Sequence, residues 1–399
     1  MNQKHSPQTN CCEKPTHNLI GIQIAAEPPK TKDQQNEVCC GSPPGPESSR
    51  FEKPGYALLD FVEVFVQTPA GPVPRVKTDL RWRDFAGTIR ARLGIKRAQY
   101  KIAPGLYCVG EPDAQAPVLV TANYKLTFDE LRKNLKDISA WILVLDTRGI
   151  NVWCAAGKGT FSTDEVIRCV KSTGLEKVVD RRRLILPQLG ATGVSAHKVK
   201  QGCGFKVVWG PVRAADLKLF LDTGLKATES MRRVTFTLAE RLVLIPVELS
   251  FVPKYLLWTV LALFLLSGIG TDIFSFKDAW FRGLILATAC LSGVFAGAVA
   301  APALLPWLPV RSFSLKGTIT GLAVGLGIVW TFWNRANGWE ALALFICTGV
   351  ISSYLAMNFT GSTPFTSPSG VEKEMRKAIP VQVAAVVLTV GFWVYGAFV

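Results

Sequence analysis

A cysteine stands where an open α/β sheet would present it to a ligand. Cys154 lies in NVWCAAGKGT (Asn151–Thr160), directly after the apolar run AWILVLD (Ala140–Asp146), and Gly157 and Gly159 close behind it leave room for something large and flat. Ligands of open α/β sheets bind beyond the carboxyl ends of the strands. A thiolate is a soft ligand that prefers transition metals. The simpler interpretation is an inert buried thiol, because cysteine is among the most buried residue types.

The Gly-Lys pair in this stretch does not make a phosphate-binding loop. A Walker motif needs a glycine that is separated from that pair by four residues, and a Ser or Thr directly after the lysine. Val152 and Gly159 occupy those two positions here. The pattern therefore argues against nucleotide hydrolysis.

The other thiols and imidazoles form weaker ligand patterns. The chain has 10 Cys and 3 His, without a C-x-x-C pair or a zinc-type spacing. This argues against an iron–sulfur cluster or a zinc site held by this chain. We expect Cys108 and Cys169 in the core, Cys203 in a loop, and His197 at the surface or in a loop.

The polar tail, residues 1–54, carries two adjacent cysteine pairs. It is rich in Pro, Gln, Asn, Lys and Ser and has no periodic apolar pattern, so we expect it to be disordered and to lack a signal peptide. The pairs are Cys11–Cys12 and Cys39–Cys40. Thiolates on a flexible tail could capture a soft ion such as Hg(II), with Cys39 and Cys40 as the candidate ligands. The pairs could equally be variation without a role.

Residues 55–250 are expected to form one α/β domain. Apolar runs alternate with amphipathic patterns, which is typical of a Rossmann-like parallel sheet with helices on both faces. Ser162 and Glu165 predict a capping box at a helix start. An aromatic-rich lead-in (Tyr56–Gln67, then VKTDLRWRDF, 76–85) is expected to add strands and a helix at the edge. The predicted strands are 117–123, 140–146, 183–187 and 205–209, and the predicted helices are 126–135, 162–174 and 213–224.

The loops after the four predicted strands are rich in Gly and Pro. Such loops permit a close approach of the backbone to a ligand, and together they could line a broad, shallow pocket at one sheet edge. The loops are 121–125, 146–160, 186–197 and 209–214. The candidate cofactor-binding residues in them are Thr121, Asn123, Asn151, Val152, Trp153, Cys154, Ala155, Ala156, Gly157, Lys158, Gly159, Thr160, Pro187, Gly190, Gly193 and Gly210.

Most of the formal net charge of +15 lies in the α/β domain, because residues 55–253 carry 30 basic and 19 acidic side chains. An anionic membrane surface on the cytoplasmic side would attract this charge. The basic residues are dispersed without the aromatic interleaving of single-strand binders, which argues against nucleic acid as a partner.

Residues 254–399 are expected to be a bundle of five transmembrane helices. The spans lie near 255–270, 279–308, 313–333, 339–357 and 379–398, and their interiors are almost free of charge. This emptiness favours an anchor over a transporter. Lys and Arg gather before the first and fifth spans and after the second, whereas the opposite loops hold only Lys277, Arg282 and Arg335. The bias predicts a multi-pass protein of the inner membrane with a cytoplasmic α/β domain and Val399 outside.

The cysteine stretch NVWCAAGKGTF resembles the signature of the mercury-methylating corrinoid proteins, the HgcA family. The likeness continues through VTANYK, LPQLGATGV and VVWGPVRA, and then through MNFTGSTPFTSPSGVEKEM (Met357–Met375). The α/β domain is similar to the corrinoid-binding part of the corrinoid iron–sulfur protein large subunit.

This resemblance implies a cobalamin-type corrinoid with Cys154 as the lower axial ligand of cobalt and as the catalytic residue. It implies methyl transfer from methylcobalt(III) to inorganic Hg(II), which forms methylmercury. The implied partners are a ferredoxin-like iron–sulfur protein, HgcB, as electron donor and a methyltetrahydrofolate-linked methyl donor. Two alternatives stay open: a membrane-tethered corrinoid methyl carrier for the acetyl-CoA pathway or other one-carbon metabolism, and a non-enzymatic ligand sensor.

Overall fold

The computed structural model describes residues 60–250, 252–359 and 368–399, except the side chains of 254–256, 368 and 369. The polar tail with Cys11, Cys12, Cys39 and Cys40 lies outside the described residues. Residues 360–367, which belong to the stretch Met357–Met375, also lie outside them.

Four parallel strands form the centre of the sheet domain, as predicted. They are β4 (Val118–Ala122), β5 (Ala140–Leu145), β6 (Arg183–Leu186) and β7 (Lys206–Trp209). Their spatial order is β5-β4-β6-β7, and each neighbouring pair is parallel. The loops after these strands therefore meet at one edge of the sheet, in agreement with the prediction.

Three further strands extend the sheet on the β5 side. The hairpin β1 (Val62–Thr68) and β2 (Gly71–Val76) comes from the aromatic-rich lead-in, and β3 (Gly105–Val109) runs antiparallel to β5. The full order of the seven strands is β1-β2-β3-β5-β4-β6-β7. The lead-in also supplies the helix α1 (Trp82–Arg92), so its predicted strands and helix are confirmed.

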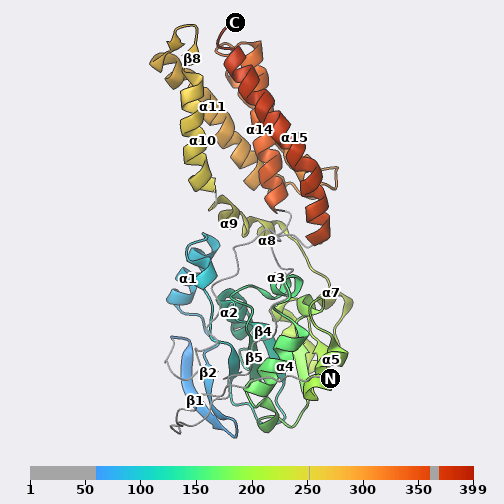
Figure 1. The fold of residues 1–399 in the computed structure, drawn as a ribbon. Coiled ribbons are helices and arrows are strands. Elements are labelled where there is room, and N and C mark those ends of the chain that lie inside the picture. Colours follow the sequence, from blue (N-terminus) through green and yellow to red (C-terminus); the bar gives the residue numbers. More distant parts are fainter. Residues whose placement is uncertain (1–59, 251, 360–367) are drawn as a thin grey trace, which may run out of the picture. The chain divides into compact units, whose positions relative to one another are not determined.

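Helices cover both faces of the sheet, because alternate strand residues point to opposite sides (Figure 1). On one face, Tyr107 and Ile142 pack with α2 (Lys125–Lys133) and α6 (Leu217–Asp222). On the other face, Cys108 and Leu143 pack with three helices. These are α3 (Val152–Gly157), α4 (Thr163–Ser172) and α5 (Ala196–Cys203).

The start of α4 corrects one local prediction. The Ser162 hydroxyl accepts a hydrogen bond from the Glu165 amide at 3.3 Å, as a capping box requires. The Glu165 carboxylate instead accepts the Asp146 amide at 2.9 Å and pairs with Arg168. The glutamate therefore joins α4 to the end of β5, because that amide needs a partner beyond the strand.

Beyond the sheet domain, the chain continues through three short helices into a helical region. The short helices are α7 (Glu229–Arg232), α8 (Leu238–Leu242) and α9 (Ile245–Leu249). Four apolar stretches that follow are long enough to cross a membrane: Phe276–Ala303, Phe313–Thr331, Gly338–Phe359 and Gly370–Tyr395. They contain α11 (Phe276–Phe295), η5 (Ala296–Ala300), α12 (Ala301–Ala303), α13 (Phe313–Thr331), α14 (Gly338–Phe359) and α15 (Pro368–Tyr395).

The expected first span is shorter than a helix that crosses a membrane. It corresponds to α10 (Val252–Ser267), whose 16 residues rise about 24 Å against a hydrocarbon core of about 30 Å. The two-stranded hairpin of β8 (Ile269–Gly270) and β9 (Ile273–Phe274) follows it. Four candidate spans are therefore observed, and a crossing by α10 is not confirmed by its length.

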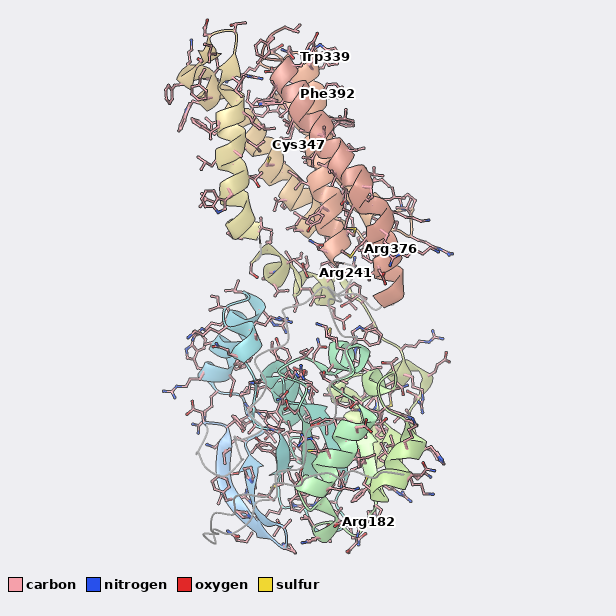
Figure 2. The ribbon with its side chains drawn as sticks, in the orientation of Figure 1. Arg182, Arg241, Trp339, Cys347, Arg376 and Phe392 are labelled. Atoms are coloured by element: carbon pink, nitrogen blue, oxygen red, sulfur yellow. The ribbon has the colours of Figure 1, made fainter. Side chains whose placement is uncertain are left out.

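The helical bundle contains a buried charge pair, and its arginine was expected in a loop. Arg282 lies in α11, and its Nε donates to Glu340 of α14 at 2.6 Å, with both side chains largely buried. The same guanidinium donates to the carbonyls of Ser267 and Trp393. Trp339 and Phe392 lie together near this end of the bundle, while Arg241 and Arg376 lie at the other end (Figure 2).

Candidate functional site

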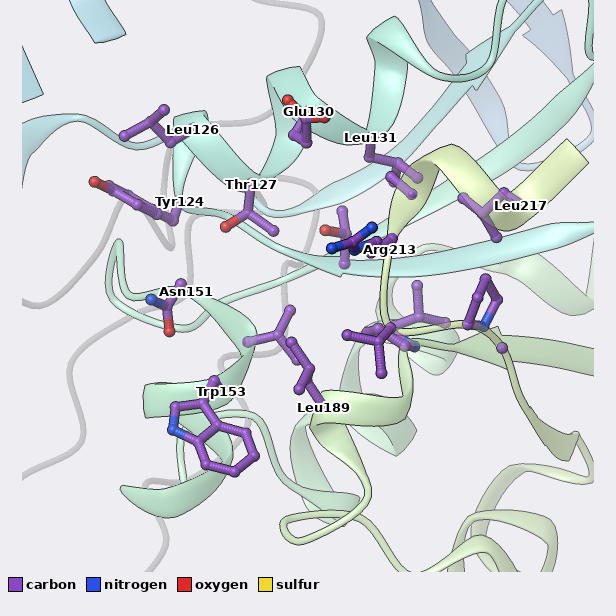
Figure 3. A pocket seen from close by; sticks show the side chains of 18 of the residues that line it. Tyr124, Leu126, Thr127, Glu130, Leu131, Asn151, Trp153, Leu189, Arg213 and Leu217 are labelled. Carbon is purple, nitrogen blue, oxygen red and sulfur yellow. The ribbon is translucent and has the colours of Figure 1, made fainter. Parts of the chain in front are cut away.

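A cavity of about 470 Å³ opens at the carboxyl ends of β4 and β6. The strand order reverses between these two strands, since the chain goes from β4 outward to β5 and then returns to β6 on the other side. Doubly wound sheets bind ligands at such a switch point, where the flanking loops diverge. Thr127 and Glu130 of α2 lie across the cavity from Asn151 and Trp153 (Figure 3).

The cavity gathers residues from all four predicted loops. Apolar side chains such as Leu189 and Leu217 make up much of its wall. Its volume falls within the range of small-molecule sites, roughly 300–1,000 Å³. The predicted residues that line it are Thr121, Asn151, Val152, Trp153, Pro187 and Gly210.

Cys154 lies in a helical turn, whereas the sequence had suggested a loop. The Asn151 side chain caps α3 by accepting the Cys154 amide at 2.8 Å, and alanines, which favour helix, follow. Cys154 itself is half-buried and follows the lining residue Trp153. Burial raises the pKa of the lining residue Tyr124. The charges of Arg97 and Arg92 lower this pKa in part, and the nearby Cys154 raises it.

The rest of the cysteine stretch divides between anchoring and exposed positions. Ala155 and Ala156 are buried in the core under the sheet, and the Thr160 hydroxyl donates to the Ala155 carbonyl at 3.4 Å. Lys158 is the C-cap residue of α3. Gly157 and Gly159 are exposed, and an added Cβ would meet nothing at either position. None of these residues lines the cavity.

The Asn123 side chain stabilises a turn, a role that the sequence did not suggest. Its side chain is fully buried and does not line the cavity. Its carbonyl oxygen accepts the amides of Thr147 and Gly149 at 3.1 and 2.9 Å and the Thr147 hydroxyl at 2.9 Å, and its amide donates to Asp146 at 3.2 Å. Asn123 therefore fixes the turn after β5, which leads directly into α3.

Gly190 and Gly193 allow the loop after β6 to pack against the cysteine helix. A Cβ at Gly190 would lie 2.5 Å from the Phe161 ring, and one at Gly193 would overlap the Phe161 carbonyl and lie 3.0 Å from the Ala156 Cα. Both glycines were predicted as ligand contacts, but neither lines the cavity. They instead let the loop after β6 pack closely against α3 and the residues that follow it.

The sequence missed the charged and polar rim of the cavity. Arg92, Arg97 and Arg213 line it together with the single carboxylate Glu130. The Arg97 guanidinium lies 5.4 Å above the Tyr124 ring. The Tyr124 side chain is only 5% exposed, and its hydroxyl has no hydrogen-bond partner among the described residues. Tyr124 and Arg213 stood within the predicted loops, whereas only the tertiary structure brings Arg92 and Arg97 to this edge.

A buried ionic cluster fixes the helix that carries Arg92. Lys125 donates to Asp84 of α1 at 2.8 Å and to Asp129 at 2.6 Å, and Arg132 pairs with the same two carboxylates. Burial would raise the pKa of Asp84, but the Lys125 hydrogen bond, the Arg81 amide and Arg132 outweigh it and lower that pKa to about 2. The cluster therefore joins α1 to α2, which forms one wall of the cavity.

The other sulfur and imidazole groups of the domain lie away from the cavity. Cys108 and Cys169 are buried core thiols, as predicted, and this burial raises the pKa of Cys108 to about 11 and that of Cys169 well above its ordinary value. Cys203 ends α5, and its Sγ donates to the Val199 carbonyl, so the expected loop position is wrong. His197 is exposed on α5, in agreement with a surface role.

Comparison with known proteins places the similarity on the sheet domain. Residues 96–221 match the family described as CO dehydrogenase/acetyl-CoA synthase delta subunit. The acetyl-CoA decarbonylase/synthase complex subunit gamma of Methanopyrus kandleri is 34% identical over 128 residues, which are 32% of this chain and 27% of that protein. The corrinoid/iron-sulfur protein large subunit of Moorella thermoacetica is 29% identical over 119 residues, 29% of this chain and 26% of that protein.

The sheet domain is similar to these subunits. The chain spans about a quarter of the length of the curated relatives it matches. The matched segment runs from the turn before β3 to α6, and it contains every predicted ligand-binding residue from Thr121 to Gly210. It ends before the helical region, so the likeness expected for residues 357–375 lies outside it.

Proposed function

We propose that the sheet domain binds a corrinoid and that the protein acts as a membrane-tethered methyl carrier. One observation carries the proposal: the segment similar to corrinoid-protein subunits supplies most of the residues that line the switch-point cavity, including Trp153, which directly precedes Cys154. Open sheets of this order use that edge for cofactors.

The residues present suit such a group. The apolar wall, including Val152 and Leu189, would cover a flat ring, and the three arginines of the rim would attract anionic side groups. The unpartnered Tyr124 hydroxyl offers a hydrogen bond that a bound molecule could accept. Cys154, next to the lining residue Trp153, supplies a soft donor atom suited to a transition metal.

When bound, a corrinoid supplies a cobalt ion that accepts and releases the methyl group. Cys154 would hold the cobalt through its thiolate sulfur. Asn151 would fix the turn that carries the thiol, through its 2.8 Å bond to the Cys154 amide. Ala155 and Ala156 would anchor that turn in the core, and Val152 and Leu189 would exclude water.

Anaerobic purification with cobalt analysis and an optical spectrum tests the proposal. We expect about one cobalt per chain, bound as a corrinoid. Cys154→Ala should keep the corrinoid but change its spectrum and lose methyl transfer, and Cys154→His should lose most of the transfer. Cys203→Ala, at the other half-buried thiol of the domain, is the matched control and should leave both unchanged. Anaerobic protein without cobalt or corrinoid absorbance would rule out the proposal.

We further propose Hg(II) as the methyl acceptor, with methylmercury as the product. The resemblance of NVWCAAGKGTF to mercury-methylating proteins supports this candidate. The Cys154 thiolate would supply electron density to a bound cobalt, which would favour donation of the methyl group to an electrophile such as Hg(II). HgcB would replace the two electrons that leave with the methyl group, and a methyltetrahydrofolate-linked protein would supply the next methyl group. The names of the relatives favour the competing acceptor, the acetyl-CoA pathway.

A labelled methyl group separates the two acceptors. The holoprotein carrying a labelled methyl group is mixed either with thiol-bound Hg(II) or with an acetyl-CoA synthase. Label in methylmercury, absent with Cys154→Ala, would support the mercury reaction. Label that passes only to acetyl-CoA would refute mercury as acceptor and leave the carrier function intact.

We also propose that α10 is a fifth crossing, with the sheet domain in the cytoplasm and Val399 outside. Asn337 donates to the Gly396 carbonyl at 2.6 Å, and Arg282 donates to the carbonyls of Ile269 and Trp393. These bonds gather the β8–β9 hairpin, the turn before α14 and the C-terminus at one end of the bundle. Arg241 of α8 donates to Pro302 and Ala303 at the other end. The chain must pass from one end to the other within α10.

A further inference from the structure

The outward face of α1 is an exposed apolar stripe. Trp82, Phe85, Ile89 and Leu93 are 77%, 50%, 53% and 45% exposed. Their spacing of three, four and four residues puts them on one side of a helix. The opposite side carries the buried residues Asp84 and Ala91. The stripe is therefore a continuous surface and not a set of scattered exposed side chains.

Basic residues border the stripe on both sides. At 3.6 residues per turn, Arg90 and Arg83, which pairs with Asp60 at 2.9 Å, lie along one margin, and Arg81 and Arg92 lie along the other. The single acidic residue of the helix, Asp84, faces inward and is neutralised by Lys125 and Arg132. The outward face of α1 thus combines apolar side chains with positive charge.

The position of α1 links it to the membrane end of the chain. α1 packs against α9, and Gly94 lies against the Ser250 side chain, so that a Cβ there would overlap the Ser250 hydroxyl. α10 begins two residues later, at Val252. The helix α8 lies next to α9, and its Arg241 donates hydrogen bonds to the carbonyls of Pro302 and Ala303. α1 therefore lies near this end of the helical bundle, where most of the basic loop residues of the bundle are found.

From this surface we propose that α1 lies in the headgroup region of an anionic phospholipid bilayer, with the stripe among the upper acyl chains. Interfacial helices have this composition: aromatic and aliphatic residues on one face and Arg or Lys at its margins, where the cations reach lipid phosphates. A folded partner would be a less good match, because α1 is tied within a few residues to a helix that starts at the membrane. This inference does not depend on the proposed methyl transfer.

The contact would orient the candidate site. Arg92 ends α1 and lines the cavity, and the Asp84–Lys125 pair joins α1 to the start of α2. A helix seated in the interface would hold the cavity mouth at a fixed distance from the lipid surface. An apolar or lipid-soluble reactant could then pass between bilayer and cavity over a short path.

Photo-crosslinking of the full-length protein in native membranes and in vesicles tests the inference. p-Benzoylphenylalanine replaces Phe85 or Ile89, and, as the matched control, the exposed Glu176 in the turn before β6 at the opposite sheet edge. We expect phospholipid adducts at 85 and 89, several-fold above those at 176. The yield should fall when phosphatidylglycerol vesicles are replaced by phosphatidylcholine, or when Arg81→Gln and Arg90→Gln are combined.

The other outcomes overturn the inference. Adducts to a second copy of the chain, to another protein or to the chain's own first 59 residues would show that a polypeptide covers the stripe. Yields at 85 and 89 equal to that at 176 would show that the stripe faces water. Mass spectrometry of the adducts distinguishes these cases.

Discussion

Gly193 and Gly157 are two glycines of the candidate site with opposite surroundings. A Cβ at Gly193 would overlap the Phe161 carbonyl and press on the Ala156 backbone, which cannot move without shifting α3. A Cβ at Gly157, the last residue of α3, would meet nothing. Substitution of Gly193 therefore tests the packing of the cysteine helix, whereas substitution of Gly157 changes the sequence motif without changing that packing.

We expect Gly193→Ala to destabilise the sheet domain by about 1–3 kcal/mol and to weaken corrinoid binding, since α3 would be displaced. Gly157→Ala is the control and should be neutral or stabilising by up to about 1 kcal/mol, because alanine favours helix. Urea unfolding of the detergent-solubilised chain, followed by pulse proteolysis, gives both values. Equal stability of the two variants would contradict the packing described for the loop after β6.

Asp84 makes the stability of the domain depend on pH. Its pKa is lowered from 3.8 to about 2, net of burial, by Lys125, the Arg81 amide and Arg132. A carboxylate with a lowered folded-state pKa contributes stability above its unfolded pKa, and that contribution is lost as pH falls toward the folded value. The contribution of Asp84 is therefore complete above about pH 4 and disappears toward pH 2.

We expect Asp84→Asn to cost about 1.5–3 kcal/mol at neutral pH, since a charge-assisted hydrogen bond is lost. The difference from wild type should shrink as pH falls through that window. Asp60→Asn, which breaks the exposed Asp60–Arg83 pair, is the control and should have little effect at any pH. A constant difference between Asp84→Asn and wild type down to pH 2 would contradict the assignment.

At the scale of the elements, α11 and α14 pack through a pair of buried thiols. The Sγ atoms of Cys290 and Cys347 lie 3.7 Å apart, surrounded by apolar residues such as Leu286 and Leu344. A disulfide requires about 2.05 Å, which small rotations of both side chains could reach.

We expect a membrane-permeant oxidant to join Cys290 to Cys347 within one chain. Peptide mass spectrometry would detect the cross-linked pair. Cys347→Ala is the control, in which Cys290 should stay available to an alkylating agent. If both thiols remain alkylated in full after oxidation, the packing of α11 on α14 differs from that described.

At the scale of the whole molecule, the number of crossings decides on which sides the two ends lie. Four crossings would return Val399 to the side of the sheet domain, whereas a crossing α10 places it on the opposite side. Leu257, Trp258, Leu261 and Leu265 of α10 are exposed and apolar, as on a lipid-facing helix. Its shortness is compatible with local thinning of the bilayer.

Reporter fusions measure this topology. We expect alkaline phosphatase fused after Val399 to be active, because it would lie outside the cytoplasm, and fluorescent protein at the same place to be dark. Deletion of residues 252–275 removes α10 with its hairpin and should reverse both results. If phosphatase is inactive and fluorescent protein is bright both with and without this deletion, α10 does not cross.

The parallel strands, and the edge at which the loops after them meet, could be predicted from the amino-acid sequence alone. Those strands are continuous apolar runs of β length, and parallel strands end on one side, so local pattern was sufficient. The same holds for the four long spans, which need only length and apolar composition. The core positions of Cys108 and Cys169 were also predicted, since cysteine is among the most buried residue types.

The contacts of the individual loop residues could not be predicted before the folded chain was known. Asn123, Gly190 and Gly193 had the composition of ligand contacts, but they hold the turn and the loop that support α3. Arg92 and Arg97 line the cavity from a helix and a turn that precede the predicted loops in the sequence. In the helical bundle, Arg282 of α11 pairs with Glu340 of α14. These roles depend on side chains that meet across long sequence separations, and hydrophobic periodicity describes only neighbours along one element.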